Sequence, residues 1–189
     1  MRKACAISAA ALKAGGEAIE PGITTAEIDK IIYDFIVRHG ARPNFLHLYG
    51  FPATACISVN DTVIHGIPNK QQQIRPGDIV SIDTGCKIDG FNGDNACTYA
   101  CGKIDLEAQR LLDVTKESLH RGIEMACGGN RVGDIGHAVQ SYVEENGFSV
   151  VRTFVGHGVG KELHGGPGGP ELRQCRTRSA SGAGHVHCR

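Results

Sequence analysis

The first forty residues place apolar side chains at the spacing of an α-helix. In residues 3–19 an apolar residue recurs every three or four positions, at Ala4, Ile7, Ala11 and Ala14. A second stripe is formed by Ile28, Ile31, Ile32, Phe35 and Ile36. Thr24 and Glu27 have the spacing of a capping box before this stripe, and Gly40 follows it. The pattern predicts two amphipathic helices, the second of which begins near Thr24 and ends at Gly40.

The pattern changes to that of β-strands between Phe51 and about Cys101. The predicted strands are ACISVN, TVIHGI, DIVSIDTGCKI and ACTYAC. Two further helices are predicted at 105–126 and 132–146, the latter closed by Gly147, and a strand FSVVRTFVG follows them. This order of helices and strands predicts an α+β domain.

The second and fourth predicted helices resemble each other in sequence. Shifting the chain by 107 positions aligns PGITTAEIDKIIYDFIVRHG with GGNRVGDIGHAVQSYVEENG without a gap. The aligned pairs are Ile28–Ile135, Ile32–Val139, Phe35–Tyr142, Ile36–Val143 and Gly40–Gly147. We favour an internal structural repeat over a chance match of two amphipathic helices. A repeat would give two related halves with a site where they meet.

Composition and charge narrow the class of protein. Of the 189 residues, 41% are hydrophobic and 21% are charged, which is typical of a globular domain. The 20 basic and 20 acidic residues balance, so a nucleic-acid or anionic-membrane partner has little electrostatic support. No apolar stretch reaches membrane-spanning length, and we expect a cytoplasmic protein. Most of the eight cysteines lie in predicted helices and strands, so we expect free thiols rather than disulfides.

Two aspartates on neighbouring predicted strands are the first candidates for chemistry. In SIDTGCKIDGFNGDNACTY, a four-residue loop from Lys87 to Gly90 would centre a hairpin midway between Asp83 and Asp94. The two carboxylates would then face each other at about 5 Å. Their repulsion, about 3 kcal/mol at a partly buried site, becomes ligation when a divalent cation binds. Two solvent-facing aspartates on an exposed hairpin remain the alternative.

Three histidines favour the interpretation as a metal site. His157 lies in VGHGVG, where small glycines leave room for the imidazole, and His164 follows seven residues later. His65 lies in VIHGIP, before a proline-bounded turn. Carboxylates combined with imidazole suit Mn, Fe, Co or Zn, and paired ions of this kind activate water.

A family resemblance rests on two long segments. The string GFPATACISVNDTVIHGIPNKQQQIRPGDIVSIDTGCKIDGFNGDNACTYACG, together with FSVVRTFVGHGVGKELH, resembles type I methionine aminopeptidases. The resemblance extends over residues 1–164 and implies the pita-bread fold, whose halves are related by a pseudo-twofold axis. It also implies a cytoplasmic enzyme with two divalent metal ions (Co, Mn, Fe or Zn). Such an enzyme removes the initiator methionine from nascent polypeptides at the ribosome by metal-activated water. It implies a monomer with no specificity for nucleic acid and no membrane partner.

The resemblance also implies a role for individual residues. Asp83 and Asp94 would be metal ligands, with Asp94 shared by both ions, and His157 would bind one of them. His65 and His164 would be catalytic residues that contact the substrate and steady the tetrahedral intermediate. The methionine pocket would be lined by Phe51 and Cys56, with Phe45 as a further candidate.

The sequence departs from the family pattern after His164. Two glutamate ligands are expected there, and the only acidic residue is Glu171, in a different context. Reading the codons one base later permits Glu-Asp-Pro-Glu-Val-Pro from Gly165, so we interpret 165–189 as a frameshifted, disordered tail behind an incomplete catalytic domain at 1–164. A natural basic tail is the alternative. With three of five ligands, binding of the second metal would be compromised, and we expect a weak or inactive chain.

Two other functions stay open at this stage. Some pita-bread proteins bind partners without catalysis, and an inactive pseudogene product would have the same sequence features. A pita-bread peptidase that cleaves before proline is the other possibility, although VIHGIP and ACISVND resemble the methionine-specific branch.

Overall fold

The computed structural model describes residues 1–170, and the chain divides into two compact units. Unit 1 contains Met1–Asp105 and Gly160–Leu163, and unit 2 contains Leu106–Val159 and the described residues from His164 onward. Unit 1 comprises α1 (Arg2–Glu17), α2 (Thr25–Arg38), β1 (Arg42–Pro43), the 3-10 helix η1 (Leu48–Gly50), β2 (Ala55–Val59), β3 (Ile79–Ile88) and β4 (Phe91–Ala100). Unit 2 comprises α3 (Leu106–Met125), α4 (Val132–Glu145), β5 (Val155–Gly158) and β6 (Gly165–Pro170).

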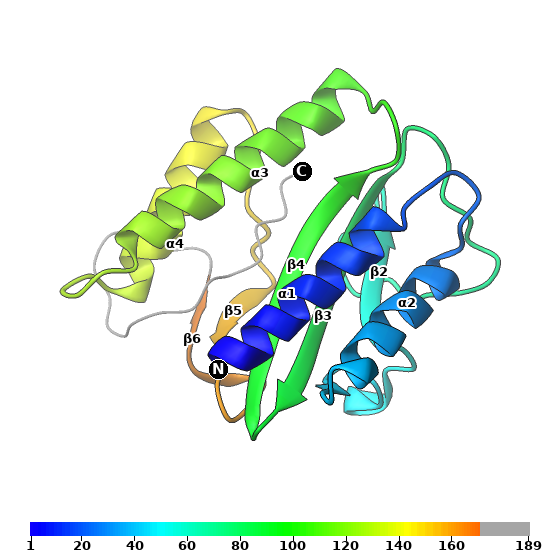
Figure 1. Ribbon diagram of the computed structural model, residues 1–189. Coiled ribbons are helices and arrows are strands. Elements are labelled where there is room, and N and C mark those ends of the chain that lie inside the picture. Colours follow the sequence, from blue (N-terminus) through cyan, green and yellow to red (C-terminus); the bar gives the residue numbers. More distant parts are fainter. Residues whose placement is uncertain (171–189) are drawn as a thin grey trace. The chain divides into compact units, whose positions relative to one another are not determined.

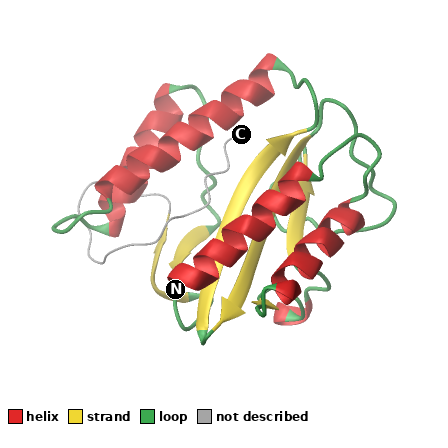
Figure 2. Cartoon of the chain, in the orientation of Figure 1, coloured by secondary structure: helices red, strands yellow, loops and turns green. Residues whose placement is uncertain are grey.

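Unit 1 is an antiparallel sheet with α1 and α2 on one face (Figures 1 and 2). The central strand β3 pairs with β1, β2 and β4. Small residues let α1 approach the sheet closely, because a Cβ added at Gly93 of β4 would lie 2.5 Å from the carbonyl carbon of Ala4. One buried hydrogen bond fastens this contact, from Ser8 Oγ to the Thr84 carbonyl at 3.0 Å.

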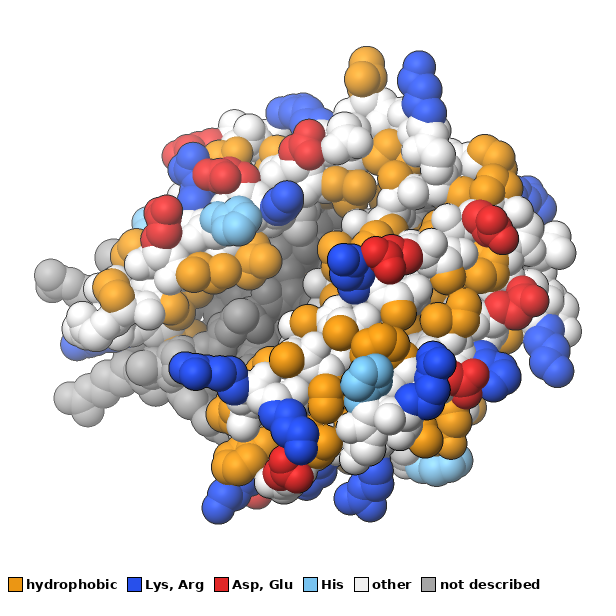
Figure 3. Space-filling model, in the orientation of Figure 1, with side chains coloured by type: hydrophobic (Ala, Val, Ile, Leu, Met, Phe, Trp, Pro, Cys, Tyr) orange, Lys and Arg blue, Asp and Glu red, His pale blue; other side chains and the backbone are white. Residues whose placement is uncertain are grey.

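The predicted start and end of the second helix are confirmed. Thr24 Oγ1 accepts a hydrogen bond from the Glu27 amide at 3.2 Å, and Glu27 Oε2 accepts one from the Thr24 amide at 2.9 Å. Gly40, just past the helix, has a φ of 70°, which glycine adopts without strain. Ile28, Ile32 and Ile36 of the apolar stripe are fully buried in the core. The opposite side of these helices carries scattered charges (Figure 3).

Unit 2 is built on the pair α3 and α4, with β5 and β6 as a two-stranded antiparallel sheet. Val114, Val139, Val143 and Val150 form its buried cluster. The rings of Tyr142 and Phe148 pack against this cluster, and each is covered by an arginine, Arg121 and Arg110 respectively. The guanidinium of Arg110 also donates to the carbonyl of Asn146, which ends α4.

The internal repeat extends to the packing inside each unit. Helices α2 and α4 are both 14 residues long and begin 107 positions apart, at Thr25 and Val132. Within unit 1, a Cβ at Gly15 would lie 2.7 Å from Ile32 Cδ1. Within unit 2, a Cβ at Gly122 would lie 2.9 Å from Val139 Cγ2, and both of these residues are also shifted by 107. Each helix pair therefore uses a glycine at the same place for its closest approach.

Two predicted strands are wrong. TVIHGI is irregular backbone, because Ile57 donates from its amide to the Gly66 carbonyl at 2.9 Å and the segment folds back on β2 instead of forming a strand. FSVVRTFVG is also mostly irregular, and regular pairing starts only at Val155. Both segments are rich in β-branched and apolar residues, but Val63, Ile67 and Phe154 are 47%, 55% and 48% exposed, so this composition reflects neither strand pairing nor core burial.

The structure also bears on the expected cysteine state, membrane helices and tail. The six cysteines described, Cys5, Cys56, Cys86, Cys97, Cys101 and Cys127, are free thiols, as predicted. No helix among residues 1–170 is long and apolar enough to cross a membrane. Residues 165–170, expected to be disordered, instead pair with β5 as strand β6, so that part of the expectation is corrected. The remainder of the expected tail, 171–189, lies outside the described residues.

The close approach of α1 to β4 predicts a strong effect of a single methyl group. In Gly93→Ala the new Cβ would meet the backbone of Ala4 and Cys5, which cannot move as a flexible side chain could. We expect the free energy of unfolding to fall by about 2 to 3 kcal/mol, measured by urea denaturation. Gly128→Ala is the control, because nothing lies within 4 Å of its Cβ. Equal stability of the two variants would contradict the packing.

Candidate active site

The turn between β3 and β4 sets the position of the two aspartates. Ile88 pairs with Phe91, so the connection is the two-residue turn Asp89-Gly90, whose φ angles are 51° and 80°. Positive φ at both central residues is typical of a type I′ turn, which matches the twist of paired strands. The expected four-residue loop from Lys87 to Gly90 is wrong.

The corrected register keeps the two carboxylates on one face but moves them apart along the hairpin. Asp83 pairs with Ala96, and Asp94 pairs with Gly85, so the aspartates are diagonal neighbours and not directly opposite each other. Because Asp94 lies two residues from Ala96, its side chain points to the same side of the sheet as Asp83. The Cβ atoms of diagonal neighbours lie about 7–8 Å apart, a distance that long side chains can bridge.

This face of the sheet is polar, whereas the opposite face packs on the helices. Ser81 and Thr98 pair across the strands on the same side as Asp83, and their hydroxyl oxygens are 2.8 Å apart. Val80, Ile82 and Cys86 alternate with them and are fully buried in the core. The hairpin therefore buries its apolar residues under the helices and places its hydroxyl and carboxyl groups on the other side.

Burial dominates the electrostatics of Asp83. It raises the pKa of this carboxyl from 3.8 to about 6, although a side-chain hydrogen bond with Asp94 acts in the opposite direction. The Oδ1 atoms of Asp83 and Asp94 are both buried. Removing two carboxylates from water is costly without a compensating positive charge. The pair is therefore a place where a cation would be bound favourably.

Two of the three residues expected to line a methionine pocket lie on or against the carboxylate face. Cys56 of β2 pairs with Asp83, and burial, followed by the charges of Asp83 and Asp94, raises the pKa of its thiol to about 12. The thiol thus stays protonated, which suits an apolar wall and not a thiolate ligand. Phe45 is buried, and its Cε1 atom would lie 3.3 Å from a Cβ at Gly85, the partner of Asp94.

The third pocket residue lies in a short loop ahead of β2. Phe51 is half-buried, its amide donates to the Leu48 carbonyl at 2.9 Å, and its carbonyl accepts from the His47 amide at 2.8 Å. His47 and Tyr49 of this loop both have positive φ angles. The backbone around Phe51 is therefore closely constrained.

His65 lies in the segment that folds back on β2. Its φ is 55°, and its neighbour Gly66 donates from its amide to Ser58 Oγ at 3.0 Å. A Cβ at Gly66 would lie 2.1 Å from the Ile57 carbonyl oxygen, so only glycine permits this approach. The Gly66 contacts therefore fix the backbone next to His65 against β2.

The other two histidines lie together in unit 2. The ring centroids of His157 and His164 are 4.5 Å apart with an interplanar angle of 87°, an edge-to-face contact. His157 lies on β5, and the Gly158 carbonyl is 3.3 Å from its Nδ1. The structure thus brings together the two aspartates with Cys56 and Phe45 in unit 1, and two of the three histidines in unit 2.

The donor chemistry fits a divalent metal ion in part. Two buried carboxylates on one sheet face are suitable oxygen ligands. Within residues 1–170, however, no group of three or more His, Cys, Asp or Glu side chains is gathered so that it could hold an ion. The described residues therefore provide the carboxylate part of a metal site.

Sequence reasoning missed Asn92, two residues before Asp94. It is buried, and both its amide and its Nδ2 donate to the Gly160 carbonyl, at 2.8 and 2.9 Å. Asn92 lies in the hairpin predicted around Asp89-Gly90, between two predicted strands, and asparagine is unfavourable in a strand, which was the available signal of another role.

The fold is of the α+β class, with a sheet that has helices on one face and Asp83 and Asp94 on the other. The chain belongs to metallopeptidase family M24, whose model matches residues 1–186. It is 51% identical over 172 residues to a methionine aminopeptidase of Clostridium perfringens, covering 91% of this chain and 69% of the relative. It is 48% identical over 149 residues to methionine aminopeptidase 1 of Bacillus subtilis, covering 79% of this chain and 60% of that protein.

Solved structures agree with the family and the pita-bread fold. The crystal structure of methionine aminopeptidase from Thermotoga maritima matches with a TM-score of 0.93 and 38% identity, over 96% of this chain and 73% of that one. A prolidase from Pyrococcus furiosus matches with a TM-score of 0.77 at 24% identity, which shows a shared fold only.

The raised pKa of Asp83 predicts how stability depends on pH without metal. Because the folded state holds this proton more tightly than the unfolded state, stability is greatest below about pH 4 with respect to this group and is lost as pH rises towards 6. With a chelator present, we expect a loss of about 3 kcal/mol across this window. In Asp83→Asn this decline should disappear, as measured by urea denaturation at each pH. An unchanged decline would show that another group causes it.

Proposed function

We propose that this chain is a methionyl aminopeptidase of the M24 family, which removes the initiator methionine from polypeptides. The observation that carries the proposal is that Asp83 and Asp94 lie on one sheet face, each with a buried Oδ1 atom, in a chain 51% identical to a methionine aminopeptidase. The substrates would be the N-termini of nascent polypeptides, which the chain would bind in the cytoplasm at the ribosome. The protein would act as a monomer.

We propose that Asp83, Asp94 and His157 hold divalent metal ions, of which Mn, Fe, Co and Zn suit this donor set. When bound, such ions supply an activated water and polarise the carbonyl that is cleaved. Asp83 and Asp94 would contribute their charge from a buried position, where ligation offsets the cost of ionisation.

Substrate binding would fall to the remaining residues. Phe45, Phe51 and the protonated thiol of Cys56 would form a soft, apolar wall for a thioether side chain. Imidazole N–H groups of His65 and His164 would donate hydrogen bonds to the peptide and to the negative charge that develops on its carbonyl oxygen. The edge-to-face contact with His157 would orient the His164 ring for this role.

A non-catalytic binding protein of the same fold is the second candidate. The composition of residues 165–189, in which Glu171 is the only acidic residue, is the observation that favours it. Retention of both aspartates and all three histidines favours the enzyme. A peptidase that cleaves before proline has only fold-level support, from structural relatives below 25% identity.

Metal binding separates the enzyme from the binding module. We expect the purified chain to bind one Mn²⁺ ion, detected by electron paramagnetic resonance, because the second ion lacks its glutamate ligands. Binding should be lost in Asp83→Asn. Asp89→Asn, on the same hairpin but exposed and paired with Lys3, is the matched control and should bind as the parent chain does. A chain that binds no Mn²⁺ would refute the metallopeptidase proposal.

Catalysis by the chain is predicted to be poor. With Mn²⁺ or Co²⁺ added, we expect methionine release from Met-Ala-Ser well below the rates of ordinary enzymes, which are about 1 s⁻¹ or faster. Release of alanine from an Ala-Pro dipeptide, the substrate of a peptidase that cleaves before proline, should be absent. Turnover of Met-Ala-Ser at about 1 s⁻¹ would contradict the expected loss, and preferential cleavage before proline would contradict the proposed specificity.

A further inference from the structure

The turn end of the β3–β4 hairpin carries a contact that the proposed chemistry does not use. At this end Asn92 of β4 pairs with Lys87 of β3, on the same side of the sheet as Asp94. The Asn92 amide and the Asn92 Nδ2 both donate to one acceptor, the carbonyl of Gly160, at 2.8 and 2.9 Å. Asn92 is only 2% exposed, so both bonds are largely protected from water.

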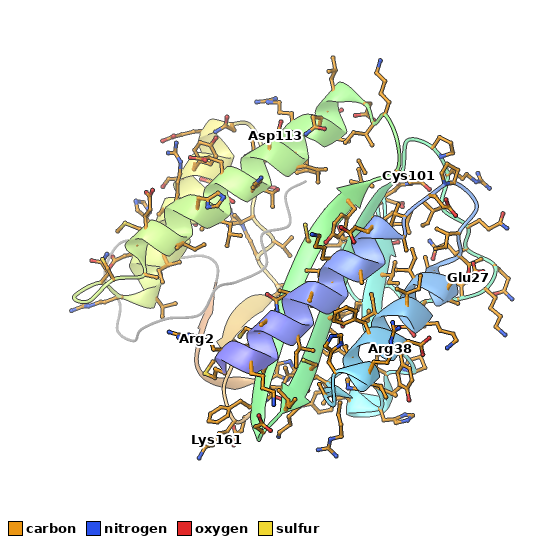
Figure 4. All side chains as sticks on the ribbon, viewed as in Figure 1. Arg2, Glu27, Arg38, Cys101, Asp113 and Lys161 are labelled. Atoms are coloured by element: carbon orange, nitrogen blue, oxygen red, sulfur yellow. The ribbon has the colours of Figure 1, made fainter. Side chains whose placement is uncertain are left out.

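The segment held by Asn92 is short and is itself ordered. Gly160 donates from its amide to the Glu162 carbonyl at 3.0 Å, which closes a tight turn. Lys87 Nζ lies 3.4 Å from the Lys161 carbonyl and donates to it. Figure 4 shows Lys161 near the turn end of the hairpin. Residues Gly160–Leu163 therefore dock on the hairpin through backbone carbonyls, which depends little on their side chains.

Histidines flank the docked segment on both sides. His157 precedes Gly160 by three residues, which limits the distance between their Cα atoms to about 11 Å. His164 directly follows Leu163. The two imidazole rings contact each other at 4.5 Å between centroids, so the chain from His157 to His164 forms a loop closed by its two histidines.

We infer that Asn92 is a positioning residue that ties the histidine-bearing loop 157–164 to the hairpin that carries Asp94. This inference rests on the proposed function, because it gives the Asn92–Gly160 contact a purpose only if Asp94, His157 and His164 act in that function. The anchor lies two residues from Asp94, so one strand carries both the carboxylate and the point at which Gly160 is held. Side-chain donation to a carbonyl already bonded by the same residue's amide adds orientation as well as strength.

Truncation of the side chain should loosen the loop without unfolding the protein. In Asn92→Ala the backbone bond remains and the Nδ2 bond is lost, and we expect amide hydrogen exchange of peptides covering 156–164 to accelerate about fivefold. Asn92→Asp keeps the size but turns an oxygen towards the Gly160 carbonyl, so acceleration should be greater. Peptides from α1 and α2 serve as internal references and should keep the exchange rates of the parent chain.

The chain offers a matched control on the same strand. The Nδ2 of Asn95 is buried and, within the described residues, makes no hydrogen bond. Asn95→Ala therefore removes the same amide three residues away without releasing Gly160, and loop exchange should stay as in the parent chain. If Asn92→Ala and Asn95→Ala accelerate loop exchange equally, or neither does, the anchor is refuted.

Mn²⁺ affinity separates a positioning role from simple tethering. The anchor predicts that Asn92→Ala binds Mn²⁺ about fivefold more weakly than the parent chain, whereas Asn95→Ala is unchanged. Faster loop exchange with unaltered affinity would overturn the positioning role while leaving the proposed metal site standing. If the parent chain binds no Mn²⁺, the proposed function fails, and the positioning role fails with it, even where the exchange result shows a structural tether.

Discussion

The pairing of β3 with β4 determines where the two proposed carboxylate ligands, Asp83 and Asp94, lie. Its register follows from the turn Asp89-Gly90, in which two consecutive positive φ angles reverse the chain without a longer loop. A slip of one residue would turn the side chains of one strand to the other face. With β3 held in place, Asp94 would turn to the helices while Asp83 stayed on the polar side. One short turn thus decides between a buried carboxylate pair and a disrupted core.

The helices of unit 1 stabilise that register from the other face. The Ser8 hydroxyl reaches the Thr84 carbonyl only if Thr84 faces α1, and Gly93 leaves the space in which Ala4 meets β4. These contacts would be lost in a slipped pairing. The hydrophobic core therefore supplies the free energy that keeps two acidic side chains in a position which would be unfavourable for an isolated hairpin.

Much of this architecture could be predicted from local sequence signals. The capping box at Thr24 and Glu27, the glycine after α2 and the shift of 107 positions all depend on neighbours a few residues apart or on comparison of the chain with itself. The membership of Asp83 and Asp94 in one face was also predictable, because it depends only on parity. Their diagonal placement was not, since it required choosing between a two-residue and a four-residue turn at the same Asp-Gly pair.

The irregular segments show a different limit of sequence reasoning. TVIHGI has the composition of a strand, yet its Gly66 lies so close to Ile57 that the chain doubles back on β2. That contact joins residues nine positions apart and leaves no trace in periodicity. The hydrogen bonds of Asn92 were not predicted for the same reason, because their acceptor, Gly160, lies 68 residues further along the chain.

The repeat and its exceptions together indicate where chemistry can develop in this fold. Both helix pairs pack through a glycine at the same relative position, so the shared part of the two halves is packing.

Asp29 of α2 breaks the repeat, because position 136 of α4 is glycine. The Asp29 carboxylate accepts hydrogen bonds from the amides of Thr54 and Ala55 at 2.9 and 2.8 Å, directly before Cys56. Burial raises its pKa despite these two bonds, so the carboxylate is held there at a cost. Within the described residues, Gly136 of α4 has no side chain that could hold a strand start in this way. Specific chemistry in unit 1 thus depends on polar contacts added to a packing scheme that both halves share.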